Sequence, residues 1–224
     1  MNVFITGASS GIGEALAQEF AARGATLGLV ARRKEILELL LKKLPGKHYI
    51  YAADVTDKYR MREIGAQFEL DSGGADIVIA NAGISVGVLT KHFEDLEAFA
   101  DTFNTNVLAV AHTFHPFIAP MSRRGRGHLV GIASVAGIRG LPGSEAYCAS
   151  KAAVINYCES LRVKLKKSGV QVQTLLPGFI KTSMTDKNPY KMPFLMRASD
   201  FASKAAKAIL AGSSYRVIPW QMAW

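Results

Sequence analysis

The sequence predicts an α/β protein of the doubly wound type, in which helices cover both faces of a parallel sheet. Short apolar runs that read as buried strands alternate with longer stretches of helical periodicity along the chain, and this alternation is typical of parallel sheets. A glycine-rich turn directly follows the first apolar run. A hydrophobic content of 49% and 20 glycines fit a well-packed protein rather than a disordered one. With 224 residues, the chain is expected to form a single domain, residues 1–224.

The expected strands are short and mostly apolar. Their ranges are Asn2–Thr6, Thr26–Ala31, His48–Ala53, Asp76–Ala80, His128–Ala133, Val170–Leu176 and Tyr215–Ile218. The expected helices run from the glycine turn to Gly24, then over Glu35–Leu44, Asp57–Leu70, Phe93–Met121, from the Ser134–Lys151 stretch to Lys167, and over Ser199–Leu210 with Ser199 as N-cap.

The first turn, residues 7–13, reads Gly-Ala-Ser-Ser-Gly-Ile-Gly and suits the pyrophosphate of a dinucleotide. The turn links a strand to a helix. Its glycines let the backbone approach the phosphates closely, and the N-terminus of the following helix offers unpaired N–H groups. The glycine spacing is G-x-x-x-G-x-G rather than the commoner G-x-G-x-x-G, so the turn alone is a weak signal.

The second strand ends in two arginines, Arg32 and Arg33, followed by Lys34. NAD-binding units usually carry Asp or Glu here to hold the ribose 2′-hydroxyl, whereas guanidinium groups pair with the 2′-phosphate of NADP. The sequence therefore favours NADP(H) as cofactor over NAD(H). Alternatively, Arg33 and Lys34 merely begin a surface helix, which makes Arg32 the stronger candidate.

Tyr147 and Lys151 lie four residues apart in an expected helix, so that the phenol and the ammonium share a face. A neighbouring cation lowers the pKa of a tyrosine, which would make the phenol a useful acid and base near neutral pH. Ser134 ends the preceding strand and could bind the same substrate oxygen. A Tyr-x-x-x-Lys pair is common on ordinary amphipathic helices, so a catalytic role needs support from the rest of the chain.

Charge, cysteine and histidine content narrow the function classes. The net charge of +9 is concentrated after residue 120, with sixteen Lys and Arg against four Asp and Glu, and no nucleic-acid-binding module accompanies it. We expect no nucleic-acid partner; the basic part attracts phosphate-bearing small molecules or an anionic membrane face, or is simply solvated.

Cys148 and Cys158 lie about 15 Å apart on one expected helix and are interpreted as free thiols of a cytoplasmic protein. The histidines lack metal-ligand spacing, so no metal is expected.

Taken together, these features resemble the short-chain dehydrogenases/reductases over nearly the whole chain. The resemblance is carried, in this order, by Thr6-Gly7-Ala8-Ser9-Ser10-Gly11-Ile12-Gly13, Asp54, Asn81-Ala82-Gly83, Asn106, Ser134, Tyr147-x-x-x-Lys151 and Pro177-Gly178. Each element is modest alone, but their order and spacing are specific. The resemblance implies a Rossmann-type domain with a seven-stranded parallel sheet in the order 3-2-1-4-5-6-7.

The resemblance also implies residue roles. Tyr147 would be the general acid/base, Lys151 would lower its pKa and hold the nicotinamide ribose, and Ser134 would bind the substrate oxygen. Asn106 would fix a water that connects Lys151 to solvent. The implied cofactor-binding residues are Gly7, Ser9, Ser10, Gly11, Ile12, Gly13, Arg32, Arg33, Asp54, Val55, Asn81, Ala82, Gly83, Tyr147, Lys151, Pro177, Gly178, Ile180 and Thr182.

The last part of the chain would supply the substrate side and the subunit contacts. Residues 183–197 would form a substrate loop, whose apolar side chains suit either an adaptable pocket or plain packing: Met184, Tyr190, Met192, Phe194 and Met196. The resemblance implies that the helix carrying Asn106 and the helix carrying Tyr147 form the interface of a homodimer or homotetramer. The short tail 219–224 holds Trp220 and Trp224, which would pack on a neighbouring subunit or, less favoured, contact a membrane peripherally.

The sequence thus predicts an NADP(H)-dependent oxidoreductase that interconverts a ketone or aldehyde and an alcohol, in particular a carbonyl reductase with a fairly apolar small-molecule substrate. Carbonyl reduction needs a hydride donor, a proton donor and a group that holds the oxygen, and the chain offers candidates for each. The alternative is a non-catalytic protein that senses NADP(H) or binds a partner on the same fold. Retention of all the proton-transfer residues argues against it.

Overall fold

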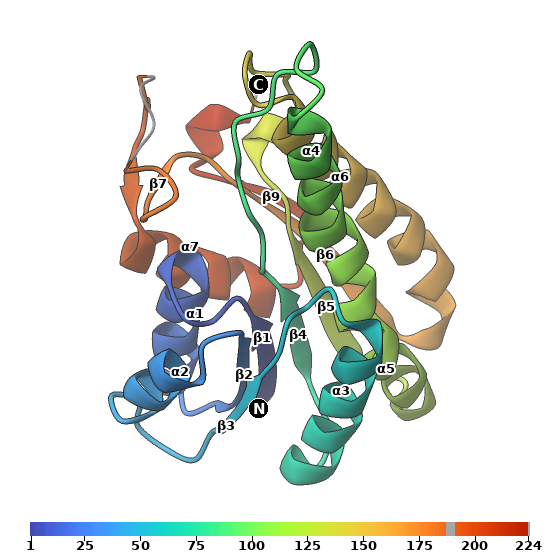
Figure 1. The fold of residues 1–224 in the computed structure, drawn as a ribbon. Coiled ribbons are helices and arrows are strands. Elements are labelled where there is room, and N and C mark those ends of the chain that lie inside the picture. The colour runs from blue at the N-terminus through green and yellow to red at the C-terminus, as the bar shows by residue number, and fades with distance from the viewer. Residues whose placement is uncertain (187–190, 224) are drawn as a thin grey trace.

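A seven-stranded parallel sheet forms the centre of the molecule in the computed structural model, which describes residues 1–186 and 191–223 (Figure 1). Its order is β3-β2-β1-β4-β5-β6-β9, and every neighbouring pair is parallel, as predicted. Tyr190 and Trp224 lie outside the described residues. The strands are β1 (Asn2–Thr6), β2 (Thr26–Ala31), β3 (Tyr49–Ala52), β4 (Ile77–Ala80), β5 (Gly127–Ile132), β6 (Val170–Pro177) and β9 (Tyr215–Ile218).

Helices cover both faces of this sheet. One layer holds α1 (Gly11–Ala22), α2 (Lys34–Leu41) and α7 (Ala198–Leu210). The other layer holds α3 (Lys58–Ser72), α4 (Asp95–Phe103), α5 (Ala109–Arg124) and α6 (Glu145–Leu165), and Figure 1 shows the two layers on opposite sides of the strands. Because both faces are buried, the strands read as continuous apolar runs rather than as an alternating pattern.

The core around Phe4 shows how small and large residues fit together. The Phe4 ring is fully buried, with its centroid 5.4 Å from that of Phe68 on α3 and 4.9 Å from that of Phe117 on α5. A Cβ on Gly65 would lie 2.3 Å from Cγ of Pro116. Glycine at this position therefore lets α3 and α5 approach closely enough to close the core over Phe4.

The prediction of one regular helix over Phe93–Met121 was wrong in its ends and in its regularity. The helical stretch begins at Asp95, ends at Arg124, and contains a π-helical turn over Asn104–Leu108 between α4 and α5. The wider turn inserts one extra residue into the helix, and such insertions are frequent at functional sites. Asn106 lies in this turn and is completely buried.

Other element boundaries also differ from the expected ones. The helix of Tyr147 begins at Glu145, and a 3-10 turn (Val135–Gly137) occupies part of the preceding stretch. Helix α7 begins at Ala198 with Arg197 as its N-cap residue, so the cap expected at Ser199 is wrong. A second, two-stranded sheet was not expected: β7 (Ile180–Lys181) pairs with β8 (Met196–Arg197).

The two cysteines are both buried free thiols on α6, which confirms that they do not form a disulfide with each other. Within residues 1–186 and 191–223, no helix is both long and apolar enough to cross a membrane. The same residues contain no group of three or more His, Cys, Asp and Glu that could hold a metal ion.

Candidate active site

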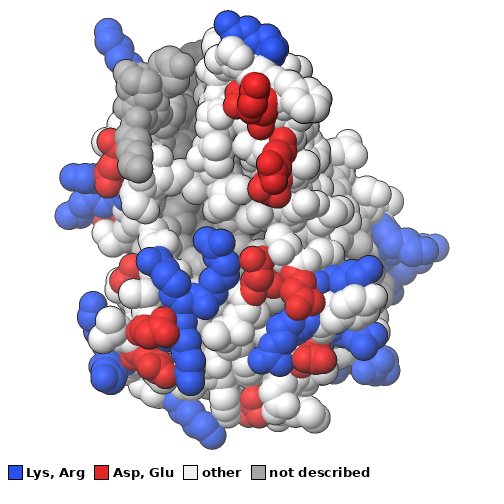
Figure 2. All heavy atoms as spheres, viewed as in Figure 1, with Lys and Arg blue, Asp and Glu red and all other residues white. Residues whose placement is uncertain are grey.

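A cleft of about 590 Å³ runs along the carboxyl ends of the strands. Strands β1 and β4 are neighbours in the sheet although two strands separate them in sequence, so their chains diverge to opposite faces here. This is the position at which open parallel sheets bind their ligands. Figure 2 shows a hollow across this face, with Lys and Arg side chains along its lower edge.

The glycine-rich turn forms one wall of the cleft. Gly7 and Gly11 have φ angles of +67° and +56°, a region that side-chain-bearing residues rarely adopt. A Cβ on Gly7 would lie 2.8 Å from Cα of Ala82. Ser9, Ser10, Gly11 and Ile12 line the cleft, and no side chain caps the first N–H groups of α1. The turn therefore presents unpaired backbone donors to an anionic ligand.

Gly13 does not line the cleft but packs against the backbone of the turn at Gly7. A Cβ there would lie 2.1 Å from the Gly7 carbonyl oxygen, so only glycine allows α1 to pack against the turn. Asn81 holds the neighbouring strand end in place. Its Nδ2 donates to the carbonyl oxygens of Thr6 and Gly7 at 3.1 and 3.4 Å. These contacts lock the ends of β1 and β4 together beneath the cleft, where Asn81, Ala82 and Gly83 line its floor.

Arg32 and Arg33 lie at the end of β2 with exposed side chains that line the cleft, as does Asp54 after β3. Burial acts to raise the pKa of Asp54, but hydrogen bonds from the backbone and hydroxyl of Thr56 and the charge of Arg32 together lower it. Arg32 therefore lies near an ionised carboxylate. Two arginines and one carboxylate leave an excess of positive charge at this end of the cleft. Val55 lies beside Asp54 and also lines the cleft.

Ser134, Tyr147 and Lys151 converge on the same cleft from β5 and α6. Lys151 is buried, and its Nζ donates to the carbonyl oxygen of Ile132 at 3.0 Å and lies 5.7 Å from the centre of the Tyr147 ring. A hydrogen bond joins the side chains of Ser134 and Tyr147. The structure thus brings together the hydroxyl, phenol and ammonium that the sequence predicted as neighbours.

The pKa of Tyr147 differs from the expectation in its direction. The pKa of Tyr147 is raised, mainly because the phenol is buried. The neighbouring Cys148 also raises this pKa, and the hydrogen bond with Ser134 lowers it by less than burial raises it. Burial also lowers the pKa of Lys151 to about 8. The predicted lowering of the Tyr147 pKa by Lys151 is therefore not what this structure shows, because desolvation dominates at both groups. The phenol is neutral at pH 7 and holds a proton.

Asn106 lies behind the cleft rather than on its wall. Its side chain exchanges two hydrogen bonds with the backbone of Ile84, with N–H to Oδ1 at 2.8 Å and Nδ2 to O at 2.9 Å. Nδ2 also donates to Oγ of Ser150 at 3.0 Å. A Cβ on Gly83 would lie 3.2 Å from Oδ1 of Asn106 and 3.5 Å from Nζ of Lys151. Asn106 therefore ties the strand end after β4 to α6, next to Lys151.

The remaining predicted residues also line the cleft: Pro177, Gly178, Ile180 and Thr182. Nine lining residues were not among the predicted site residues or the predicted substrate loop: Ala31, Ala53, Thr56, Ile84, Asp101, Asn104, Thr105, Ile132 and Ala133. Asp101, Asn104 and Thr105 are spaced three and four residues apart and so share one helix face, and this spacing of polar residues was the signal available for them. Met184 lines the cleft as well, whereas the side chain of Phe194 is exposed.

Comparison with known proteins decides the family. Residues 1–192 match the family model described as short chain dehydrogenase. The chain belongs to this family. A relative named as an uncharacterized oxidoreductase of Myxococcus xanthus is 38% identical, over 98% of this chain and 87% of the relative. As a member of this family the protein is an oxidoreductase, one that acts on CH–OH or carbonyl groups with NAD or NADP.

Solved short-chain dehydrogenases share the whole fold with this chain. One from Sphingobium yanoikuyae, in complex with NADPH, has a TM-score of 0.86 and 28% identity, over 97% of this chain and 87% of its own. One from Burkholderia phymatum, in complex with NAD, has a TM-score of 0.89 and 25% identity, over 99% of this chain and 90% of its own. Because both cofactors occur among similar structures, the choice between them rests on the residues of this chain.

Proposed function

We propose that this short-chain dehydrogenase is an NADP(H)-dependent carbonyl reductase with a fairly apolar small-molecule substrate. The observation that carries the proposal is the joint placement of Ser134, Tyr147 and Lys151 at one part of the cleft and of Arg32 and Arg33 at another. The first group suits proton transfer to an oxygen, and the second suits a phosphate on the adenosine ribose.

The residues present fit a nicotinamide dinucleotide. The cleft volume lies within the roughly 300–1,000 Å³ of ligand sites, and a Cβ on Gly7 or Gly13 would obstruct the turn that forms its wall. Ser9 to Ile12 would hold the pyrophosphate, Asp54 and Val55 the adenine, and Arg32 with Arg33 the 2′-phosphate. Asn81, Ala82 and Gly83, with Pro177, Gly178, Ile180 and Thr182, would hold the nicotinamide half beside Tyr147 and Lys151.

In the proposed mechanism, the bound dinucleotide supplies the hydride and the chain supplies orientation and the proton. Ser134 and Tyr147 would each donate a hydrogen bond to the substrate carbonyl oxygen, polarising it. Tyr147 would then transfer its phenolic proton to that oxygen as negative charge develops there. Lys151 would stabilise the resulting phenolate, and Asn106 would position the loop after β4 and a water that returns the proton. A neutral phenol is the form that this step requires.

We also propose that the protein works as a homodimer or homotetramer in the cytoplasm. The helices α4, α5 and α6 would form the interface, with Trp220 packing on a neighbouring subunit; peripheral membrane contact through the tail 219–224 is the less favoured alternative. Leu108, in the π-helical turn between α4 and α5, and Val163 on α6 have exposed apolar side chains, which supports such an interface.

The test is NADPH oxidation, followed by absorbance, against a panel of ketones and aldehydes with the purified protein. Turnover with NADPH that exceeds turnover with NADH is the expected result. Tight NADPH binding together with no turnover on any carbonyl compound would contradict the proposal and favour the NADP(H)-sensing alternative.

Arg32→Asp should change the cofactor preference. The substitution removes a charge-assisted hydrogen bond to the 2′-phosphate and adds a repulsive carboxylate, so the Kd for NADPH should rise by about 100-fold or more. The Kd for NADH should change by less than about fivefold. Isothermal titration with both cofactors measures this difference. The control is Arg123→Asp, which makes the same change in net charge at an exposed residue of α5; equal losses for NADPH and NADH in Arg32→Asp would remove Arg32 from the phosphate site.

A further inference from the structure

Strand β3 lies at one edge of the sheet, and among the residues that the structure describes it pairs with β2 alone. Just beyond its end, the N–H of Ala53 donates to the carbonyl oxygen of Ala31 on β2 at 3.0 Å. The next two residues, Asp54 and Val55, line the cleft. An edge strand lacks the second row of backbone hydrogen bonds that fixes an inner strand. The cleft wall that follows β3 therefore needs an anchor from outside the sheet.

The turn that follows β3 is held together mainly by its own hydrogen bonds. The N–H of Asp57 donates to the carbonyl oxygen of Asp54 at 3.1 Å, and the N–H and hydroxyl of Thr56 both donate to Oδ1 of Asp54. The side chain of Asp57 caps α3 by accepting from two N–H groups of that helix. These bonds shape the turn and the start of α3, but they do not attach the turn to the rest of the fold.

A side chain of helix α5 makes that attachment. Nδ1 of His112 lies 3.1 Å from the carbonyl oxygen of Val55. Because a carbonyl oxygen can only accept, Nδ1 carries the hydrogen and donates it. Val55 is buried in the core between the sheet and the helices α3 and α5. A buried carbonyl group that loses its partner is unfavourable, so this bond fixes the position of the turn.

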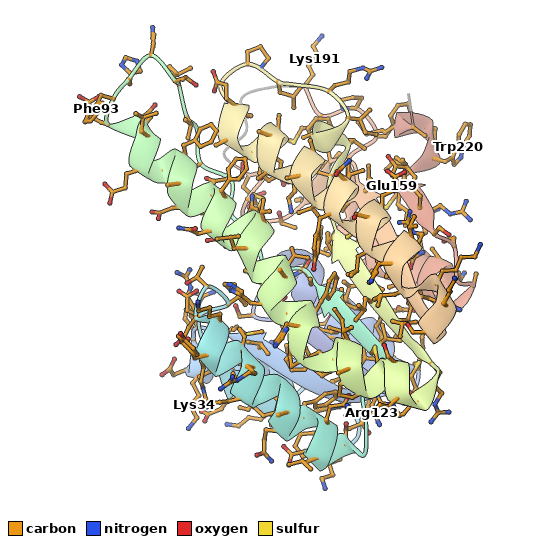
Figure 3. All side chains as sticks on the ribbon, turned by 90° about the vertical axis from the view of Figure 1, so that its right-hand side faces the viewer. Lys34, Phe93, Arg123, Glu159, Lys191 and Trp220 are labelled. Carbon is orange, nitrogen blue, oxygen red and sulfur yellow. The ribbon has the colours of Figure 1, made fainter. Side chains whose placement is uncertain are left out.

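The helical stretch of α4 and α5 is thereby attached to both halves of the cleft. Asn106 bonds to the backbone of Ile84 after β4, and His112 bonds to Val55 after β3. Strands β1 and β2 separate β3 from β4 in the sheet. Figure 3 shows this stretch as one long helix that ends near Arg123, with α6 beside its α4 part and α3 beside its α5 part. One helix therefore holds two distant parts of the cleft wall in register.

The position of the His112 ring points to its nitrogen rather than to its bulk. The ring is half-buried and borders a second cavity of about 410 Å³ between α3, α5 and α6. A side chain that borders open space is not needed to fill a core. His115, one turn later on α5, lines the same cavity with an exposed side chain, and its ring makes no hydrogen bond with any residue that the structure describes. The bond to Val55 therefore distinguishes the two histidines.

We infer that His112 is a positioning residue for the adenosine half of the dinucleotide, because its ring fixes the carbonyl oxygen of Val55 and with it the cleft wall formed by Asp54 and Val55. The inference rests on the proposed cofactor and adds a residue outside the cleft to its binding. His112 does not line the cleft, so it acts through Val55. Its removal should weaken cofactor binding and leave the chemical step unchanged.

The test compares the wild type with His112→Phe and His112→Asn. Phenylalanine keeps a flat ring without nitrogens, whereas the asparagine amide can donate from the position of Nδ1. The three residue types have similar helix propensities, so helix stability does not separate the variants. Isothermal titration should show the Kd for NADPH rising about 5- to 30-fold in His112→Phe, the effect of one lost buried hydrogen bond, and staying within about threefold of the wild type in His112→Asn. His112→Leu takes the place of His112→Phe if the larger ring prevents folding.

Two further readouts separate positioning from a general loss of structure. Adenosine 2′,5′-bisphosphate, which contains only the adenosine half, should lose affinity in His112→Phe by the same factor as NADPH. Because adenine is common to both cofactors, NADH should also lose affinity by that factor, in contrast to the result expected for Arg32→Asp. At saturating NADPH, kcat should stay within about twofold of the wild type while KM for NADPH rises with Kd.

The matched control is His115→Phe, which makes the same substitution one turn away and should leave every Kd within about twofold of the wild type. An unchanged Kd for NADPH in His112→Phe, or equal losses in His112→Phe and His112→Asn, would overturn the inference. A loss for NADPH that adenosine 2′,5′-bisphosphate does not share would overturn it as well. The proposed reductase fails separately, because wild-type protein that binds NADPH and reduces no carbonyl compound leaves these comparisons of Kd intact.

Discussion

Tyr147→Phe should lower kcat for carbonyl reduction by about 100- to 10,000-fold, the range that a positioned general acid contributes. The substitution keeps the ring and removes the hydroxyl that is hydrogen-bonded to Ser134. Because burial raises the pKa of this phenol, the proton is present throughout the neutral range, and its loss is felt at every pH tested. The Kd for NADPH should change by no more than about fivefold, equivalent to one neutral hydrogen bond. Single-turnover kinetics and a cofactor titration measure the two quantities.

Tyr157→Phe is the matched control for this variant. Tyr157 lies on the same helix, and its ring stacks on Phe114 with centroids 6.4 Å apart. Removing its hydroxyl makes the same chemical change away from the cleft, so kcat should stay within about twofold of the wild type, as surface changes of small energy do. Turnover that survives in Tyr147→Phe would assign the proton donor to another group.

The fold could be predicted because its determinants are local and repeated. Buried runs such as Val3 to Ile5 are apolar on both faces, and this composition is typical of strands in the interior of a parallel sheet. Helical periodicity between such runs predicts crossover connections. The family resemblance implied that Asp54 and Asn81 bind one cofactor, and both line the cleft. This fits the sheet geometry, because parallel strands place their carboxyl ends at one edge.

Other features depend on contacts that the sequence does not encode locally. The π-helical turn at Asn104–Leu108 depends on the hydrogen bonds that Asn106 exchanges with Ile84 across the fold. The pKa shifts of Tyr147 and Lys151 depend on how deeply both groups are buried, and helical spacing alone says only that they are neighbours. For this reason their proximity was predicted correctly and the direction of the Tyr147 shift was not.

Lys151→Met should abolish most of the activity and yet raise the free energy of unfolding at pH 7 by about 2 kcal/mol. Burial lowers the pKa of Lys151 from 10.5 to about 8, which corresponds to an unfavourable free energy of about 3 kcal/mol for the charged form. Loss of the hydrogen bond to the carbonyl oxygen of Ile132 offsets about 1 kcal/mol of the gain. Methionine fills a similar volume without a charge. A functional group that destabilises the fold in this way is typical of an active site.

The pH dependence separates this desolvation effect from a general change in packing. Below about pH 8, Lys151 is charged in both the folded and the unfolded state. The folded protein is therefore destabilised by the full free energy of burying the charged ammonium. Between about pH 8 and pH 10.5 the folded state releases the proton while the unfolded state still holds it, and wild-type stability should rise relative to that of Lys151→Met. Urea unfolding at pH 7 and pH 10, at one protein concentration, should therefore show an advantage for the variant that shrinks or vanishes at the higher pH. Lys167→Met, at an exposed position beyond the end of α6, should differ from the wild type by less than about 0.5 kcal/mol at both pH values. A Lys151→Met protein less stable than the wild type at pH 7 would mean that the bond to Ile132 outweighs the desolvation of the ammonium.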